Sequence, residues 1–167
     1  SDSSDSWTIT STSVSWLTMT HTAGASTAAL AGIPDDGDVG SYSVTVTVAD
    51  AAGATGTQTF TIVVANTNDA PSITSSGTTT GTEDTAYSYS ITSSDDDSDS
   101  SDSWTITCTT CPSWLSISHT AGASTATLSG TPLDANVGAN SVVVQVADAA
   151  GATGTESFTI TVANTND

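Results

Sequence analysis

The stretch "NSVVVQVADAAGATGTESFTITV", residues 140–162, decides the fold. Apolar residues occupy every second position on both sides of a glycine-containing turn. They are Val142, Val144 and Val146 before the turn, and Phe158, Ile160 and Val162 after it. A period of two is typical of a β-strand that buries one face. The stretch therefore predicts two strands, each with its apolar side toward a core.

The same pattern occurs twice in the chain. Residues 42–64, "YSVTVTVADAAGATGTQTFTIVV", repeat it, and "SDSSDSWTIT", "SWL", "HTAGASTA" and "VANTND" also occur in two copies. "CTTCP" in the second copy has one residue more than "STSV" in the first. The distance along the chain between equivalent residues of the two copies therefore increases by one just before Trp16 and Trp114. The repeat predicts two domains. Residues 1–69 form a partial domain that lacks its first strands, the counterpart of 70–97, and residues 70–167 form a complete domain.

Further segments show the same alternation and complete the fold prediction. "AYSYSIT", "WTI" and "WLSIS" place Tyr87, Tyr89, Ile91, Trp104, Ile106, Leu115 and Ile117 on inward faces. No segment has helical periodicity. About seven short strands in a unit of about 98 residues indicate an all-β fold of small β-sandwiches with Greek-key connections.

The charge is unusual and excludes two classes of partner. The 167 residues contain 18 Asp and Glu but no Lys or Arg, so the net charge is −18. Nucleic acids and anionic membrane surfaces would find no cationic side chain, and neither is expected as a partner. No apolar run approaches the roughly 18 residues of a membrane helix, so no membrane insertion is expected. The counter-charges must be metal ions, solution ions or a chain terminus.

The segment "PSWLSISHTAGASTATLSGTP", followed by "NVGANSVVVQVADAAG" and "ESFTITVANTND", carries a resemblance to a known family. It resembles the dystroglycan-type cadherin-like domain, an immunoglobulin-like tandem repeat of bacterial and archaeal surface proteins. The resemblance covers residues 70–167 and the parts of the repeat present in 1–69. It implies tandem immunoglobulin-like (cadherin-like) Greek-key β-sandwiches that bind Ca²⁺ at the junctions between domains.

The resemblance also implies which residues bind the ions. At the first junction these are Asn66, Asn68 and Asp69 of the linker, with Asp95, Asp97, Asp148 and Asp38 as further candidates. At the next junction they are Glu83, Asn164, Asn166 and Asp167, and Asp50, the counterpart of Asp148, faces the junction before Ser1. Ca²⁺ takes 6–8 oxygen ligands at about 2.3–2.6 Å, and Asp, Asn and main-chain carbonyls supply such oxygens. Asn66 and Ala70 stand where cadherins usually carry Asp and Asn, which implies weaker binding or fewer ions. The alternative is a solvated acidic surface with diffuse counterions.

Cys108 and Cys111 form a C-T-T-C motif at the end of a strand. A redox-active motif needs a helix N-terminus or an activating base, and a zinc site needs two ligands beyond His119. We therefore expect a local disulfide, which also indicates an oxidising compartment. The first copy has Ser11 and Val14 in the aligned region, so the fold does not require the bridge. A Ser-His-Asp triad at His21 or His119 is not expected, because no G-x-S-x-G elbow accompanies either residue. Both histidines are instead expected as exposed turn residues.

These observations predict a structural repeat of an extracellular, cell-surface adhesin stalk or fibre that calcium makes rigid. The expected partners are neighbouring copies of the same repeat or subunit, with a glycan or cell-surface ligand bound elsewhere in the full-length protein. The missing strands of residues 1–69 indicate either a truncated array or strands donated by an adjacent subunit, which would give a head-to-tail filament. The alternative function is a carbohydrate-binding module, which predicts a row of exposed Trp or Tyr. No enzyme activity is expected.

Overall fold

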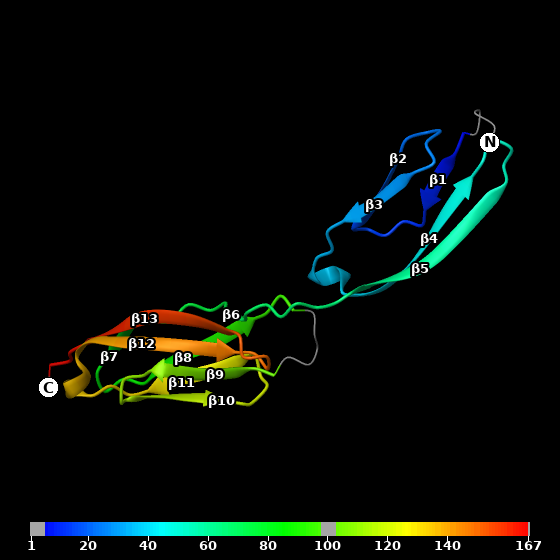
Figure 1. The fold of residues 1–167 in the computed structure, drawn as a ribbon. Coiled ribbons are helices and arrows are strands. Elements are labelled where there is room, and N and C mark those ends of the chain that lie inside the picture. Colours follow the sequence, from blue (N-terminus) through cyan, green and yellow to red (C-terminus); the bar gives the residue numbers. More distant parts are fainter. Residues whose placement is uncertain (1–5, 98–102, 167) are drawn as a thin grey trace. The chain divides into compact units, whose positions relative to one another are not determined.

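A computed structural model describes residues 6–97 and 103–166, and the chain forms two compact units, residues 1–67 and 68–167 (Figure 1). Both units are built from β-strands, so the predicted all-β class is confirmed. The division falls two residues before the predicted boundary, because Asn68 and Asp69 hydrogen-bond to the second unit. The described residues contain no helix with the length and apolar character that crossing a bilayer demands.

The second unit is a two-layered sandwich. Its described strands are β6 (Ser72–Ile73), β7 (Thr80–Thr82), β8 (Tyr87–Ser94), β9 (Thr105–Thr110), β10 (Leu115–His119), β11 (Thr125–Gly130), β12 (Gly138–Ala147) and β13 (Thr153–Ala163), with a 3-10 turn at Asp134–Asn136. One sheet has the order β10-β11-β8-β6 and the other β7-β13-β12-β9 (Figure 1). All neighbours are antiparallel except β7, which runs parallel to the end of β13.

The core of the second unit lies between these two sheets. It contains Tyr87, Tyr89, Ile91, Ile106, Leu115, Ala126, Leu128, Val142, Val144, Val146, Ile160 and Val162. Val144 and Val146 are fully buried, whereas Ser141 is exposed. The alternation in residues 140–162 therefore corresponds to the inward and outward faces of β12 and β13.

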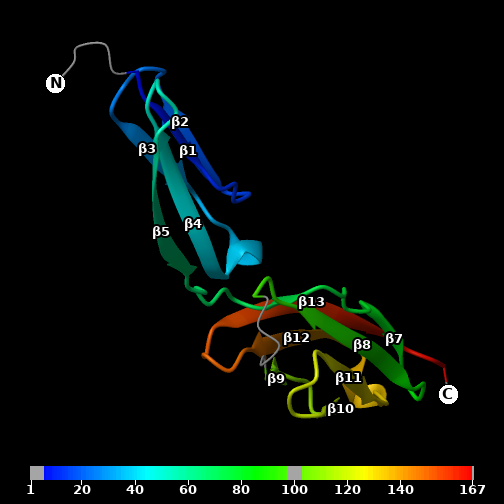
Figure 2. The same cartoon turned by 90° about the vertical axis from the view of Figure 1, so that its right-hand side faces the viewer.

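The first unit contains fewer strands among its described residues. They are β1 (Thr8–Ser11), β2 (Leu17–His21), β3 (Ala28–Gly32), β4 (Gly40–Ala49) and β5 (Thr55–Val64), with a 3-10 turn at Asp36–Asp38. One sheet has the order β1-β4-β5, and β2 and β3 form a second sheet (Figure 2). These strands correspond to β9–β13. Within residues 6–67 no strand corresponds to β6, β7 or β8.

The extra residue of the second copy lies in a β-bulge. The register between β9 and β12 shifts, because Val144 faces Cys108 while Val143 faces Thr110. Thr109 is the additional residue, and its hydroxyl donates a 3.3 Å hydrogen bond to the Val143 carbonyl. The bulge thus accommodates the insertion without displacing the rest of the repeat.

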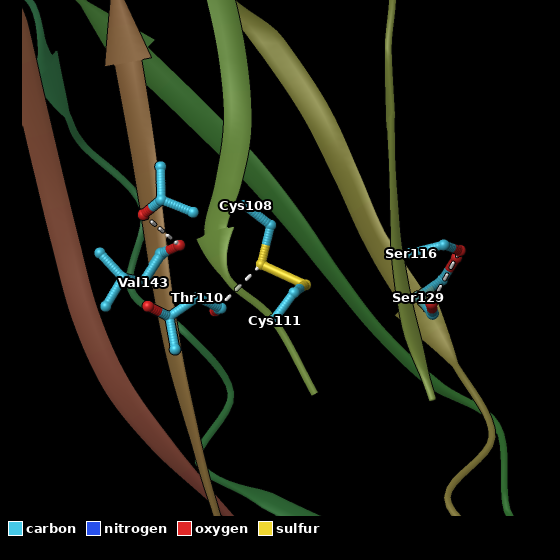
Figure 3. Close-up of a disulfide and its surroundings, with 7 residues drawn as sticks. Cys108, Thr110, Cys111, Ser116, Ser129 and Val143 are labelled. Carbon is cyan, nitrogen blue, oxygen red and sulfur yellow. Dashed lines mark hydrogen bonds between the residues drawn. A yellow bond between two sulfur atoms is a disulfide. The ribbon is translucent and has the colours of Figure 1, made fainter. Parts of the chain in front are cut away.

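The position of the bulge also shows which residue of the first copy corresponds to Cys111, and the alignment with Val14 expected from the sequence was wrong. The amide of Leu115 donates to the Pro112 carbonyl as the amide of Leu17 donates to the Val14 carbonyl. Pro112 is therefore the counterpart of Val14, and Ser13 is the counterpart of Cys111. The structure joins Cys108 to Cys111 by a disulfide at the end of β9 (Figure 3).

The two histidines are not exposed turn residues, so that expectation was wrong. His119 ends β10, is half-buried, and has one ring nitrogen 3.1 Å from the Thr125 carbonyl oxygen and the other 3.0 Å from that of Trp104. His21 makes the equivalent contacts in the first unit. Each ring therefore connects the two sheets of its unit. It lies on a strand of one sheet and contacts the carbonyl of the residue just before one strand of the other sheet, β9 or β1.

Candidate metal centre

Three segments of the second unit meet where the linker enters it. Asn68 and Asp69 precede β6, Asp95 and Asp97 follow β8, and Asp148 follows β12. Because β6 and β8 are antiparallel, the residues before β6 lie beside those after β8.

A glycine allows the linker to approach the turn between β12 and β13. A Cβ atom at Gly154 would lie 2.0 Å from the Pro71 carbonyl oxygen, so any side chain at that position would push the linker away. This contact brings the linker to the side of the sandwich where Asp148 lies.

A chain of hydrogen bonds connects the predicted ligands. The Asn68 side-chain amide donates to Asp148 Oδ2 and to the Asp69 carbonyl, both at 2.8 Å. The Asp69 amide donates to Asp97 Oδ2 at 2.9 Å, and the Asp97 amide lies 3.5 Å from Asp95 Oδ1. We call Asn68, Asp69, Asp95, Asp97 and Asp148 the Asp69 cluster. The structure therefore brings together all the second-unit residues predicted for this junction.

Asp148 also has a structural role in its own turn. Its Oδ1 accepts hydrogen bonds from the amides of Gly151 at 2.6 Å and Ala152 at 2.8 Å. The hydrogen bond from Asn68, followed by these amides, lowers the pKa of the Asp148 carboxyl, although partial burial opposes the shift. Asp50 accepts from the amides of Ala52 and Ala54 in the same way. Both aspartates thus stabilise a hairpin turn whether or not an ion is bound.

Asp95 has an oxygen that the protein leaves unsatisfied. The side chain is half-buried, and its Oδ2 is buried without a hydrogen-bond partner. It borders an open depression lined by Asp69, Ala70, Ser72, Ser94, Asp95 and Asp96. Asp96 was missed as a candidate, although it lies in the same acidic run. The exposed carboxylates of Asp69 and Asp96 thus line the same depression as Asp95.

Glu83, at the other end of the second unit, also has a buried carboxylate oxygen without a partner. It follows β7, is only 2% exposed, and donates its backbone amide to the Ala163 carbonyl at 3.0 Å. Its Oε1 accepts from the Thr165 amide at 2.5 Å and the Thr165 hydroxyl at 2.9 Å, whereas Oε2 is buried without a partner. Asp84 adopts a left-handed conformation (φ 57°), and its backbone amide donates to the Pro132 carbonyl, which holds the turn after Glu83 in place.

The remaining predicted ligands have local roles or lie elsewhere. Asp38, in the first unit, accepts hydrogen bonds from the Asp35 amide at 3.1 Å and the Ser15 hydroxyl at 3.3 Å. Asn66 also belongs to the first unit and is exposed. Asn164 donates to the Thr165 carbonyl, Asn166 is exposed, and Asp167 lies outside the described residues.

The donor set fits a hard cation. A buried carboxylate oxygen without a donor is costly, because the charge has lost its water and gained no partner. The chain has no Lys or Arg to compensate Asp95 or Glu83. Carboxylate oxygens, such as those of the Asp69 cluster and of Glu83, are ligands of the kind that Ca²⁺ takes in proteins. Within residues 6–97 and 103–166, no three His, Cys, Asp or Glu side chains are arranged to hold a metal ion by themselves.

The aromatic side chains pack into or against the cores of the units. All described Trp, Tyr and Phe side chains are buried or half-buried. Trp104 and Trp114 pack against the core of the second unit, and Trp114 meets the Tyr87 ring edge-on at 5.7 Å and donates to Asn140 Oδ1 at 3.1 Å. The row of exposed aromatic rings expected of a carbohydrate-binding module is not found among the described residues.

Comparison with known proteins supports the fold assignment. Residues 1–65 and 70–163 match the family described as Putative Ig domain. No curated protein matches the chain. Among solved structures, the chain is similar to the extracellular domain of protocadherin GammaB4 (17% identity, TM-score 0.69, 98% of this chain and 27% of that chain). It is also similar to extracellular cadherin domains 3–6 of protocadherin Gamma B2 (15% identity, TM-score 0.70, 96% and 40%).

A third similar structure is an enzyme. It is an endo-fucoidan hydrolase of glycoside hydrolase family 107, with 29% identity and a TM-score of 0.50. The alignment covers 96% of this chain but only 24% of the hydrolase. The protocadherin similarities, at their low identity, show the fold alone, and the chain corresponds to about a quarter of the hydrolase.

Proposed function

We propose that this chain, which belongs to the Putative Ig domain family, is a non-enzymatic structural repeat of an extracellular surface protein, such as an adhesin stalk or fibre. The two-unit array and the cadherin-like fold support this role. In such an array each unit is a rigid domain, and the stiffness of the whole array depends on the junctions between the units. The partners are neighbouring copies of the same repeat or subunit.

We further propose that Ca²⁺ binds at both ends of the second unit. The observation that carries this proposal is the pair of buried carboxylate oxygens without partners, Asp95 Oδ2 and Glu83 Oε2, in a chain without Lys or Arg. The Asp69 cluster would hold one ion, and Glu83 with Asn164 and Asn166 would hold another. A bound divalent cation supplies the positive charge that the side chains lack.

The proposed consequence is mechanical. Asn68 and Asp69 lie in the linker, so an ion bound to them and to Asp95 fastens the linker to the sandwich. Without the ion, the carboxylates of the Asp69 cluster repel one another. Calcium would therefore stiffen the linker and stabilise the second unit.

Thermal unfolding in Ca²⁺ and in EGTA tests this proposal. Extracellular calcium modules have dissociation constants of about 10⁻⁴–10⁻³ M, so about 10 mM Ca²⁺ should stabilise the chain by about 1.4–2.7 kcal/mol per site. Asp95→Asn and Glu83→Gln should each reduce the calcium-dependent rise of Tm. Asp134→Asn, which changes an exposed carboxylate on the second 3-10 turn, is the matched control and should retain the full rise. Equal Tm values in Ca²⁺ and EGTA would exclude calcium binding.

A carbohydrate-binding appendage is the second candidate function. The similarity to part of an endo-fucoidan hydrolase favours it. The burial of the aromatic side chains disfavours it, because stacking on sugar rings requires exposed aromatic faces, and all described aromatic side chains are buried or half-buried. Affinity electrophoresis of the chain in gels containing fucoidan distinguishes the two functions, since a structural repeat should migrate unretarded.

A further inference from the structure

The side-chain amide of Asn68 lies between two acceptors. Its Nδ2 donates to Asp148 Oδ2 and to the main-chain carbonyl of Asp69, both at 2.8 Å. An ionised carboxylate and a carbonyl can accept hydrogen bonds but cannot donate them. The nitrogen of the amide, and not its oxygen, must therefore face both groups, because the reverse orientation would bring three acceptor oxygens together.

Asp148 uses one oxygen for its own turn and the other for the linker. Oδ1 accepts from the amides of Gly151 and Ala152, and Oδ2 accepts from Asn68. Asp50 holds the equivalent turn of the first unit through its Oδ1, so the turn itself requires only this oxygen. Asp148 is only 8% exposed. A carboxylate oxygen so far from water needs a donor or a cation, and Asn68 is the donor.

A cation bound at this place requires the opposite orientation of the amide. Ca²⁺ takes oxygen ligands, and the Asn68 side chain has only one oxygen, Oδ1. Rotation by half a turn about the last side-chain bond exchanges the nitrogen and the oxygen while the backbone stays in place. Asn68 can therefore present N–H groups to Asp148 when no ion is bound, and an oxygen to an ion when one is bound.

We propose that the Asn68 amide is an internal substitute for the cation, which holds the linker on the second unit without an ion and competes with the ion for Asp148. The inference rests on the proposed function, because it concerns the affinity of the same site. It adds that the linker is attached before calcium binds. Calcium then reinforces an existing contact, and the release of Asn68 lowers the affinity of the site.

The neighbouring contacts support attachment of the linker without an ion. The Asp69 amide donates to Asp97 Oδ2 at 2.9 Å, and the Asp69 carbonyl accepts from Asn68. Gly154 allows the Pro71 carbonyl to approach the start of β13. These contacts involve the main chain of the linker and persist when a side chain rotates. The contact of Asn68 with Asp148 is different, because half a turn of one side chain releases it.

Exchange of the two side chains tests the contact in EGTA. Asn68→Asp places two carboxylates against each other and should lower the Tm of the second unit by about 5 °C or more. Asp148→Asn should also lower the Tm, because its oxygen still serves the turn and its nitrogen then faces that of Asn68. The double variant Asn68→Asp with Asp148→Asn again has one donor and one acceptor. It should recover most of the loss, since the coupling belongs to the pair.

Calcium titration of the same full-length variants tests the competition. In isothermal titration with Ca²⁺ alone, Asn68→Asp should bind about tenfold more tightly than the native chain, because no hydrogen bond to Asp148 has to be released. Thr67→Asp is the matched control for charge. It adds a carboxylate at an exposed position one residue earlier and should increase the affinity by less than about threefold.

Three outcomes would overturn the inference. They are an unchanged Tm of Asn68→Asp in EGTA, a double variant no more stable than the single variants, and equal gains in calcium affinity for Asn68→Asp and Thr67→Asp. The double variant distinguishes loss of this contact from a general folding defect, because only the former is recovered. Failure of the calcium proposal is seen separately, as equal Tm values of the native chain in Ca²⁺ and EGTA.

Discussion

The side-chain amide of Asn68 donates a 2.8 Å hydrogen bond to Oδ2 of Asp148, although 80 residues separate them in the chain. The contact attaches the linker to the turn between β12 and β13. It explains why Asn68 belongs to the second unit, and it places an amide and a carboxylate beside Asp69 and Asp97.

This contact predicts an acid-sensitive second unit. The pKa of Asp148 is lowered from 3.8 in the folded state, chiefly by Asn68, so the unfolded chain binds the proton more tightly. The stabilisation is present above pH 3.8 and is lost as the pH falls through the lower folded pKa. In urea unfolding at pH 7 and pH 3 in EGTA, Asp148→Asn should show a smaller loss of stability on acidification than the native chain. An unchanged loss would contradict the assignment, and Asp134→Asn is the control.

Tyr89 predicts a corresponding loss at high pH. Burial, opposed by the hydrogen bond to Ser75 and assisted by that to Glu156, raises the pKa of Tyr89 to about 12. A raised pKa stabilises the fold below the unfolded value of 10.0, and this contribution is lost as the pH rises from 10 toward 12. Chemical unfolding between these pH values, with tyrosinate absorbance as readout, should show a shallower decline for Tyr89→Phe. An identical decline would show that another group governs alkaline unfolding.

Gly77 is expected to tolerate no side chain. A Cβ atom there would lie 2.6 Å from three atoms of the Phe158 ring, and the Gly77 amide donates to Glu156 Oε1 at 2.7 Å. Gly77→Ala should destabilise the second unit by about 1–3 kcal/mol, the usual cost of overpacking. Gly81→Ala is the matched control, because its Cβ would make only ordinary contacts from 3.5 Å. Equal Tm values for the two variants would refute the steric explanation.

Removal of the disulfide should weaken the second unit without unfolding it. The bridge closes a loop of only four residues, for which chain entropy predicts about 2 kcal/mol. The first unit forms β1 and β4 with Ser11 and Ser13 at the equivalent positions, so the strand pairing does not depend on the bridge. The double variant Cys108→Ser and Cys111→Ser should retain its β-sheet circular dichroism and show a lower Tm. Loss of the β signal at room temperature would contradict this prediction.

Several features of this protein follow from the sequence by itself. The alternation of Val142, Val144 and Val146 predicted their burial, because the two faces of a strand are set by local backbone geometry. The repeat predicted two units, and the absence of Lys and Arg predicted carboxylates without cationic partners. Each of these features can be read from the order of neighbouring residues, from a repeated segment or from the composition, so none of them requires knowledge of tertiary contacts.

Only the tertiary structure decided which carboxylates lack a partner. Glu83 stands in a polar segment with no local sign of burial, and it becomes buried because β7 pairs in parallel with the distant end of β13. The burial of Asp95 Oδ2 and the bulge at Thr109 likewise depend on strands that are far apart in the chain. Alternation determines which face of a strand is apolar, but the partner of each edge and the surroundings of each carboxylate arise only when distant strands meet.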